Sequence, residues 1–263
     1  MKKFLVLCMM LVLAAGVLAG CGNDAAKKDE GGKIVVGLDD NFPPMGFKDE
    51  NNEIVGFDID LAKEAAKRLG REVEFKAIDW SSKEAELQSG RVDVLWNGLD
   101  ITEKRKENML FSEPYMDNRQ IIFVVKGNPA GIKDEATLAG KTVGTQSGST
   151  TEEYLDKNAA FKASLKEAKM YPDFINAFMD LENGRIDAVV VDEIVGRYYI
   201  SKHPDKLEAV DVPVGPISTF GIAFKKDNQK LRDEVQKVID EMVKDGTASK
   251  VSEKWFAADI IKK

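Results

Sequence analysis

One short segment occurs twice in this chain, and the repeat constrains the fold more than any other feature. Residues 87–96 have the sequence LQSGRVDVLW and residues 181–190 have LENGRIDAVV, so Leu, Gly, Arg and Asp recur at the same spacing. Each copy indicates the end of a helix, a glycine that stops it and a short apolar strand. We therefore expect two similar α/β halves, the alternative being that a common helix-to-strand junction has arisen twice by chance.

Strands and helices are predicted to alternate around both copies of the repeat. In the first half, a strand at 33–38 is followed by a helix that Asp58 caps and Gly70 stops, and then by a strand at 73–78. In the second half, a strand at 141–145 leads into a helix that opens with a capping box formed by Ser149 and Glu152. This alternation implies a mostly parallel sheet in each half, with ligands bound at the carboxyl ends of the strands.

The chain is expected to cross between the halves twice. The apolar segment 120–126 is predicted to lead into the second half, and 220–224 to lead back. Beyond the return, the stripe of Leu231, Val235, Val238, Ile239 and Met242 indicates a long helix. A shorter helix that contains Trp255 and Phe256 is expected to pack back on the first half.

The amino terminus has the pattern of a secretory signal. Lys2 and Lys3 precede an apolar run at 4–19, which is short for a membrane-spanning helix, although an uncleaved anchor is the alternative. The run closes on Leu-Ala-Gly before Cys21, which resembles the lipobox of bacterial lipoproteins and predicts a lipidated Cys21. The polar segment 21–32 is then expected to be a flexible tether. The remaining cysteine, Cys8, lies inside the signal, so no internal disulfide is expected.

Composition excludes several function classes. The net charge of the full sequence is −7 and no basic stripe is present, which argues against nucleic acid as a partner. The single histidine, His203, lies in a polar segment typical of an exposed turn, and no cysteine follows Cys21. Neither a Ser-His-Asp triad nor a His/Cys metal site is therefore expected, and we predict no cofactor and no catalysis.

The segment 97–105 combines features suited to a small carboxylate. It follows the first repeat, turns at Gly98 next to Asn97, and opens a helix whose first turn carries Arg105. A guanidinium offers a fork of donors that matches a carboxylate, and the N–H groups at a helix start add partial positive charge. The alternative is a surface helix with a solvated arginine.

Short motifs are distributed through the region 33–256: Asp39 with the Phe-Pro-Pro at 42–44, GFDIDL at 56–61, ITEKR at 101–105, FSEPY at 111–115, GST at 148–150 and KWF at 254–256. On these motifs the chain resembles the polar-amino-acid family of solute-binding proteins that serve ABC importers. The resemblance implies a two-lobed α/β periplasmic-binding-protein-like fold of type II, in which two hinge strands join the lobes and the ligand binds in the cleft between them.

The resemblance also implies a division of the chain and a set of ligand contacts. The expected parts are a signal peptide at 1–20, the lipid-anchored linker at 21–32, a first lobe at 33–122 and 220–263, and a second lobe at 123–219. Arg105 takes the α-carboxylate with help from Ser149 and Thr150, and Asp192 takes the α-ammonium. Phe42 and Trp80 match positions that sandwich the ligand side chain. The full set of expected ligand-binding residues is Asp39, Phe42, Trp80, Asn97, Gly98, Asp100, Arg105, Ser149, Thr150 and Asp192.

Asp100 departs from the family pattern, in which Ser or Thr usually occupies this position. With Asp39, Asp192 and Glu193, it would give the cleft more negative charge than a zwitterion neutralises, which favours lysine, arginine or ornithine. Alternatively, Asp100 shares the ammonium with Asp192 or bonds a nearby backbone amide. The ligand would then be a neutral polar amino acid such as glutamine or cystine.

The sequence thus predicts an extracytoplasmic protein that captures one amino acid and delivers it to a membrane permease and its ATPase. It is expected to be a monomer on the outer face of the cytoplasmic membrane, or on the periplasmic side where an outer membrane is present. Two alternatives stay open. One is an exported enzyme of the same fold, such as a dehydratase, and the other is a sensor that presents its ligand to a separate receptor.

Overall fold

The computed structural model describes residues 32–263. The predicted signal peptide at 1–20, Cys21 and nearly all of the tether at 21–32 lie outside the described residues. Lys33–Lys263 form one unit that contains two five-stranded sheets. In the part of the chain that is described, no helix has the length and apolar character needed to span a membrane.

The two sheets share one plan. The first has the order β5 (Val73–Ala77), β1 (Ile34–Leu38), β6 (Val94–Leu95), β15 (Ala223–Lys225), β7 (Met109–Phe111). The second has the order β11 (Glu167–Tyr171), β10 (Thr142–Gln146), β12 (Ala188–Asp192), β9 (Gln120–Val125), β13 (Leu207–Pro213). In each sheet the first three strands are parallel and the fourth is antiparallel to its neighbours. The predicted α/β class with two similar halves is confirmed.

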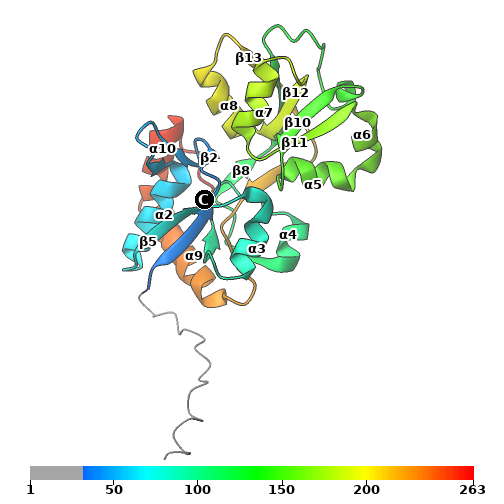
Figure 1. The fold of residues 1–263 in the computed structure, drawn as a ribbon. Helices are drawn as coiled ribbons and strands as arrows, with labels where there is room; N and C mark the ends of the chain where they lie inside the picture. The colour runs from blue at the N-terminus through cyan, green and yellow to red at the C-terminus, as the bar shows by residue number, and fades with distance from the viewer. Residues whose placement is uncertain (1–31) are drawn as a thin grey trace, which may run out of the picture. The chain divides into compact units, whose positions relative to one another are not determined.

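Helices cover both sheets (Figure 1). The first sheet carries α2 (Phe57–Arg68), α3 (Lys83–Gln88), α4 (Glu103–Asn108), α9 (Gln229–Lys244) and α10 (Thr247–Phe256). The second carries α5 (Thr150–Lys157), α6 (Ala159–Ser164), α7 (Phe174–Glu182) and α8 (Glu193–Lys202). The short elements are β2 (Asn41–Phe42), β3 (Gly46–Lys48), β4 (Ile54–Val55), η1 (Trp80–Ser82) and η2 (Ala136–Leu138).

The repeated residues hold equivalent places in the two sheets. Leu87 and Leu181 are completely buried near the ends of α3 and α7, and Gly90 and Gly184 follow with φ of 74° and 66°. Positive φ is the conformation that lets a glycine end a helix at low cost.

The repeated aspartates make the same bond in both lobes. Asp93 accepts a hydrogen bond from the backbone N–H of Val35 at 2.9 Å, and Asp187 accepts one from Thr142 at 2.7 Å. Each carboxylate therefore ties its own strand to the start of the neighbouring one, and the junction is a structural repeat.

A two-stranded sheet connects the lobes. It pairs β8 (Met116–Asn118) with β14 (Ser218–Phe220) in antiparallel register. The prediction that 120–126 crosses between the halves is wrong, because β9 pairs with β12 and β13 inside the second sheet. The segment is apolar because a central strand is buried on both faces. The division of the chain at 122 and 219 remains a prediction.

The two carboxyl-terminal helices agree with their predicted faces. The buried residues of α9 are Leu231, Val235, Val238, Ile239 and Met242. In α10 the Trp255 ring lies 6.0 Å from that of Phe47, and Phe256 lies 5.0 Å from Phe57. The helix therefore packs back on the first lobe, as expected.

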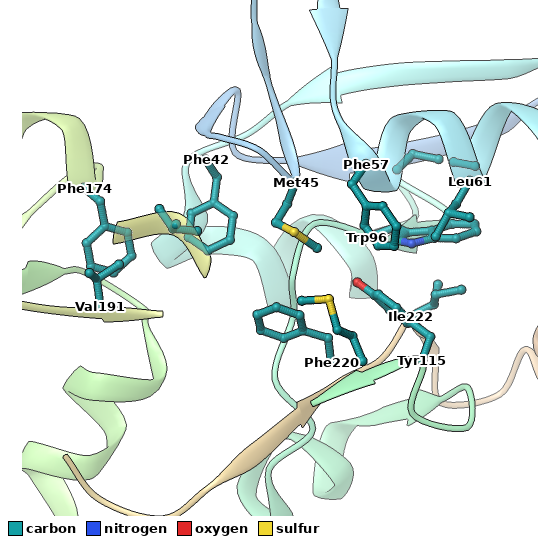
Figure 2. Packing of buried hydrophobic residues seen from close by; sticks show 14 of the residues in the cluster. Phe42, Met45, Phe57, Leu61, Trp96, Tyr115, Phe174, Val191, Phe220 and Ile222 are labelled. Carbon is teal, nitrogen blue, oxygen red and sulfur yellow. The ribbon is translucent and has the colours of Figure 1, made fainter. Parts of the chain in front are cut away.

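One apolar cluster includes residues of both lobes. Figure 2 shows the ring of Phe42, from β2 of the first lobe, beside that of Phe174, from α7 of the second. Their centroids are 6.0 Å apart. Met45 and Phe220 continue the cluster toward the connecting strands, so the polar residues at the strand ends adjoin a buried apolar surface.

Candidate functional site

Polar side chains from the ends of β1, β6 and β10 meet at Asp39. Its backbone N–H donates to Asn97 Oδ1 at 3.0 Å, and its carboxylate accepts from the N–H of Asn41 and from Gln146 Nε2 at 2.6 Å. Burial raises the pKa of Asp39 to about 6. Of the predicted residues, Asp39 and Asn97 thus lie together, and Gln146 of the second lobe joins them unexpectedly.

Gly98 needs to be a glycine at this turn. Its φ is 55°, and a Cβ here would lie 2.8 Å from the ring of Phe42. Its N–H donates to Asp58 Oδ2 at 2.6 Å, and the hydroxyl of Tyr115 donates to the same oxygen at 3.0 Å. The prediction that Asp58 caps α2 is wrong, because Gly56 occupies the N-cap and the Asp58 side chain points into the core. Burial raises the pKa of Asp58 to about 7.

The guanidinium of Arg105 is buried, which rules out the solvated surface arginine. Thr102 caps α4 and accepts the backbone N–H of Arg105 at 3.2 Å. The guanidinium donates to Glu153 Oε1 at 2.7 Å through Nε, to the Asp100 carbonyl through Nη1 and to the Gly148 carbonyl through Nη2. An arginine has five N–H donors, so one remains on each terminal nitrogen, which is the fork that a carboxylate needs.

Asp100 and Asp192 share two amide donors. Asn118 Nδ2 lies 3.0 Å from Asp100 Oδ1 and 2.5 Å from Asp192 Oδ1, and Gln120 Nε2 reaches the same two side chains at 3.2 and 2.7 Å. Burial raises the pKa of both carboxyls, that of Asp192 to about 7, with the charge of Asp100 adding to the effect. Two buried carboxylates from the two lobes are therefore poised to hold a cation.

Hydroxyl groups complete the surroundings of Asp100. Ser218 Oγ and Thr150 Oγ1 each donate to it at 2.6 Å. Together with Asn118 and Gln120, four side-chain donors reach this carboxylate, instead of the backbone amide proposed as one alternative. Thr150 crosses from the second lobe, so its hydroxyl hydrogen is committed to Asp100.

Half of the predicted capping box is formed at the start of α5, where Ser149 is the N-cap. Ser149 Oγ accepts the N–H of Glu152 at 3.1 Å, and Glu152 Oε2 accepts the N–H of Gly148 at 2.5 Å. The return bond thus goes to Gly148 and not to Ser149. The Ser149 hydroxyl also lies 3.2 Å from Thr145 Oγ1.

Trp80 lies beside a buried lysine that the sequence did not single out. Lys83 Nζ lies 5.3 Å from the centre of the Trp80 ring and donates to the carbonyls of Trp80 and Gly148 at 3.3 and 2.8 Å. Burial, with the charge of Arg105, lowers the pKa of Lys83 to about 7. Trp80 itself is 7% exposed.

These contacts bring Asp39 together with Asn97, Phe42 with Gly98, and Asp100 with Arg105, Thr150 and Asp192. Trp80 connects to Arg105 through Lys83 and the Gly148 carbonyl, whereas Ser149 bonds within its own lobe.

Several residues that the sequence did not single out take part: Asp58, Lys83, Asn118, Gln120, Gln146, Glu153 and Ser218. Among these missed residues, only Asp58 lies in one of the sequence motifs, GFDIDL at 56–61, which could have marked it as part of the site. His203 lies elsewhere, stacked on Tyr199 and 2.9 Å from Glu182. Within residues 32–263, no group of three His, Cys, Asp or Glu side chains is arranged to hold a metal ion.

Two α/β lobes that present polar groups to each other at their strand ends define a two-lobed binding protein. The chain belongs to the bacterial extracellular solute-binding proteins, family 3, whose model matches residues 34–258. It is 35% identical over 257 residues to the L-cystine-binding protein TcyJ of Escherichia coli K12, a match that covers 97% of this chain and 95% of that protein.

Solved structures agree with this assignment. A substrate-binding protein of an ABC uptake transporter from Streptococcus pneumoniae with bound histidine has a TM-score of 0.83 and 33% identity, covering 88% of this chain and 95% of that one. An ancestral arginine-binding protein bound to arginine has a TM-score of 0.80 and 44% identity, covering 85% and 98%. The predicted family and the type II two-lobed fold are confirmed.

Proposed function

We propose that this protein captures one amino acid outside the cytoplasm and delivers it to an ABC importer. The observation that carries the proposal is that one buried guanidinium, of Arg105, and two buried carboxylates that share amide donors, of Asp100 and Asp192, lie where the lobes meet. A zwitterion that leaves water needs both of its charges paired and hydrogen-bonded. Family membership and the relatives that bind cystine, histidine or arginine support this function over the alternative of an exported enzyme.

In this proposal Arg105 binds the α-carboxylate through its two remaining terminal N–H groups, and Asp192 binds the α-ammonium. At the N-terminus of α5, Thr150 adds a backbone N–H donor, whereas that of Ser149 already donates to the Gln146 carbonyl. Phe42 and Trp80 bury the ligand side chain, and the ring of Trp80 offers a cation–π contact to a basic one. Asp39, Asn97 and Gly98 shape the first-lobe wall.

A thermal-shift screen of the twenty amino acids with ornithine and cystine tests the function. A ligand that binds only the native state raises the melting temperature by mass action. We expect one or a few of these compounds to raise it. No shift with any of them would contradict the proposal.

The ligand class depends on Asp100. We favour a basic ligand, because the carboxylates Asp39, Asp100, Asp192 and Glu153 outnumber the cations Lys83 and Arg105. If Asp100 pairs with a basic side chain, Asp100→Thr should lower the affinity for arginine or lysine while glutamine binding holds. If Asp100 only shares the α-ammonium, binding of all amino acids should weaken together.

We further propose that a diacylglyceryl group on Cys21 holds the protein at the extracytoplasmic face of the membrane, where a permease and its ATPase accept the ligand from a monomer. At least two acyl chains are needed for stable anchoring, and the diacylglyceryl cysteine supplies them. Cys21→Ala should release the protein into the soluble fraction of lysed cells. Continued retention in the membrane fraction would contradict the anchor.

A further inference from the structure

The lobes touch directly beside Arg105, at the carbonyl of Gly148. Lys83 Nζ and Arg105 Nη2, both from the first lobe, donate to this oxygen at 2.8 and 3.2 Å. Gly148 has a φ of 76°, and a Cβ there would lie 2.9 Å from the Cα of Ser81 and 3.0 Å from the carbonyl oxygen of Trp80. Only glycine allows the second lobe to approach this closely.

A second direct contact lies one helical turn away, at Glu153 of α5. Its Oε1 accepts from Arg105 Nε at 2.7 Å, and its Oε2 accepts from Thr102 Oγ1 at 3.1 Å. The side chain of Arg105 is 1% exposed and that of Glu153 is 10% exposed. The ion pair therefore spans the lobes in a place from which water is largely excluded.

We propose that Lys83 and Glu153 are positioning residues for ligand binding, which clasp the two lobes around Arg105 and so slow the release of the ligand. The contacts of Lys83 with Gly148 and of Glu153 with Arg105 are called the interlobe clasp below. Its role in ligand release rests on the proposed amino acid binding, whereas its role in holding the lobes together does not.

The clasp acts on closure because its bonds exist only while the lobes are together. Bonds of this kind stabilise the closed arrangement relative to an open one, and a ligand held between the lobes leaves after they open. Losing the clasp should therefore raise the dissociation rate and leave the association rate nearly unchanged.

Glu153 also orients the guanidinium. By binding Nε, it fixes the plane of the Arg105 side chain and leaves donors on both terminal nitrogens for a carboxylate. Lys83 reaches the same carbonyl as Arg105 Nη2, so it adds a second bond that holds the Gly148 turn against the first lobe.

Stopped-flow binding of L-arginine to the purified protein tests the effect on release. Lys83→Met and Glu153→Gln keep the size of each side chain and remove its charge. Each variant should release L-arginine on the order of tenfold faster than the parent, with an association rate within about twofold. Unchanged release in both variants would overturn the proposal.

A matched control is Glu182→Gln. Glu182 is another glutamate of the second lobe, with a 12% exposed side chain that accepts from Lys206 at 2.8 Å within that lobe. Its release rate should equal that of the parent. If Glu182→Gln speeds release as much as Glu153→Gln does, the effect comes from general destabilisation and the clasp is refuted.

Small-angle scattering without any amino acid gives a readout that does not need a ligand. Lys83→Met and Glu153→Gln should each increase the radius of gyration over that of the parent and of Glu182→Gln. An unchanged radius in both variants would overturn the clasp, even if the proposed function holds. Conversely, failure of every amino acid to bind the parent would refute the function while scattering still tests the clasp. Because the two residues lie on different lobes, one variant serves if the other does not fold.

Discussion

The two lobes share the repeated helix-to-strand junction at 87–96 and 181–190, called the frame below. They differ in the segment that comes after each repeated strand. In both, the arginine of the repeat pairs with an acid five residues earlier, Arg91 with Glu86 at 2.8 Å and Arg185 with Asp180 at 2.8 Å. After β6 the first lobe adds a loop and α4, which places Arg105. After β12 the second lobe enters α8 directly, with Asp192 at its N-cap. The repeated residues therefore build the frame, and the groups proposed to bind the ligand come from the segments in which the lobes differ.

The sharpest test of this comparison replaces two arginines by alanine in separate variants. One is Arg105, which is proposed to bind the ligand, and the other is an arginine of the frame. Arg105→Ala should lower ligand affinity by about 2–5 kcal/mol, roughly 30-fold to several thousand-fold, because a buried charge loses its partner. Asp192→Ala should have a similar effect through the ammonium. Calorimetric titration with the amino acid found in the thermal-shift screen measures both.

Arg91→Ala is the matched control, because its side chain is 56% exposed and belongs to the frame. Exposed ion pairs contribute about 0–1 kcal/mol, so its affinity should remain near that of the parent. Near-parent binding by Arg105→Ala would contradict the site.

Substitutions in the frame should have a smaller effect, on stability, and the effect should be similar in the two lobes. Asp93→Ala and Asp187→Ala each remove a charged acceptor from a strand N–H, which should lower the free energy of unfolding by about 1.5–3 kcal/mol. Urea denaturation of the two variants should give similar losses, with little change in ligand affinity. A loss confined to one lobe would show that the repeat is not equivalent in the two halves.

The smallest expected effect is a pH dependence of ligand affinity, caused by protonation of the carboxylates at the candidate site. The pKa of Asp192 is raised to about 7, so below that pH the ligand-free protein holds a proton that an ammonium ligand must displace. Affinity should fall by up to about tenfold for each pH unit below 7. Titrations at pH 8, 7 and 6 measure this, and constant affinity over that range would contradict it.

The unfolding free energy should change in the opposite direction. Because the native pKa of Asp192 lies above its ordinary value, the native state binds more protons than the unfolded state between about pH 4 and 7. The ligand-free protein should therefore gain stability as the pH falls from 7 toward 4, and the raised pKa values of Asp58 and Asp39 act in the same sense. Thermal melts across this range measure the slope.

Local patterns were sufficient to predict the frame but not the contacts between lobes. The buried stripe of α9 follows from helical periodicity. The sequence left open whether Arg105 is buried or solvated, because its partners Glu153 and Gly148 come from the second lobe. Glu153 and Gln146, in contrast, meet residues from which they are far apart in sequence. Lys83 lies on a short helix, where the sequence gives no sign of burial, and it contacts Gly148 of the second lobe as well as Trp80 of its own.

Two errors have a local physical reason. Aspartate is a common N-cap residue, which is why the sequence predicts that Asp58 caps α2. However, a Cβ at position 56 would lie 2.2 Å from the carbonyl oxygen of Met45, so only a glycine fits there. Gly56 is therefore the N-cap, and the side chain of Asp58 turns into the core. The connecting strand β8 has three residues, which is too short to give a pattern. The longer apolar segment 120–126 beside it has the clearer pattern, which is why the sequence predicts the crossing there.

The pairing of β8 with β14 has a consequence for how the free protein meets its ligand. Asn118 and Ser218 face each other in this ribbon, and both donate to Asp100. Thr150 and Gln120, which also donate to Asp100, come from the second lobe, so the four donors tie this carboxylate both to the connecting ribbon and to the second lobe. In this arrangement of the lobes, fixed protein dipoles replace the water that Asp100 gave up on folding. A charged ligand that binds beside it would meet a carboxylate whose orientation is already set.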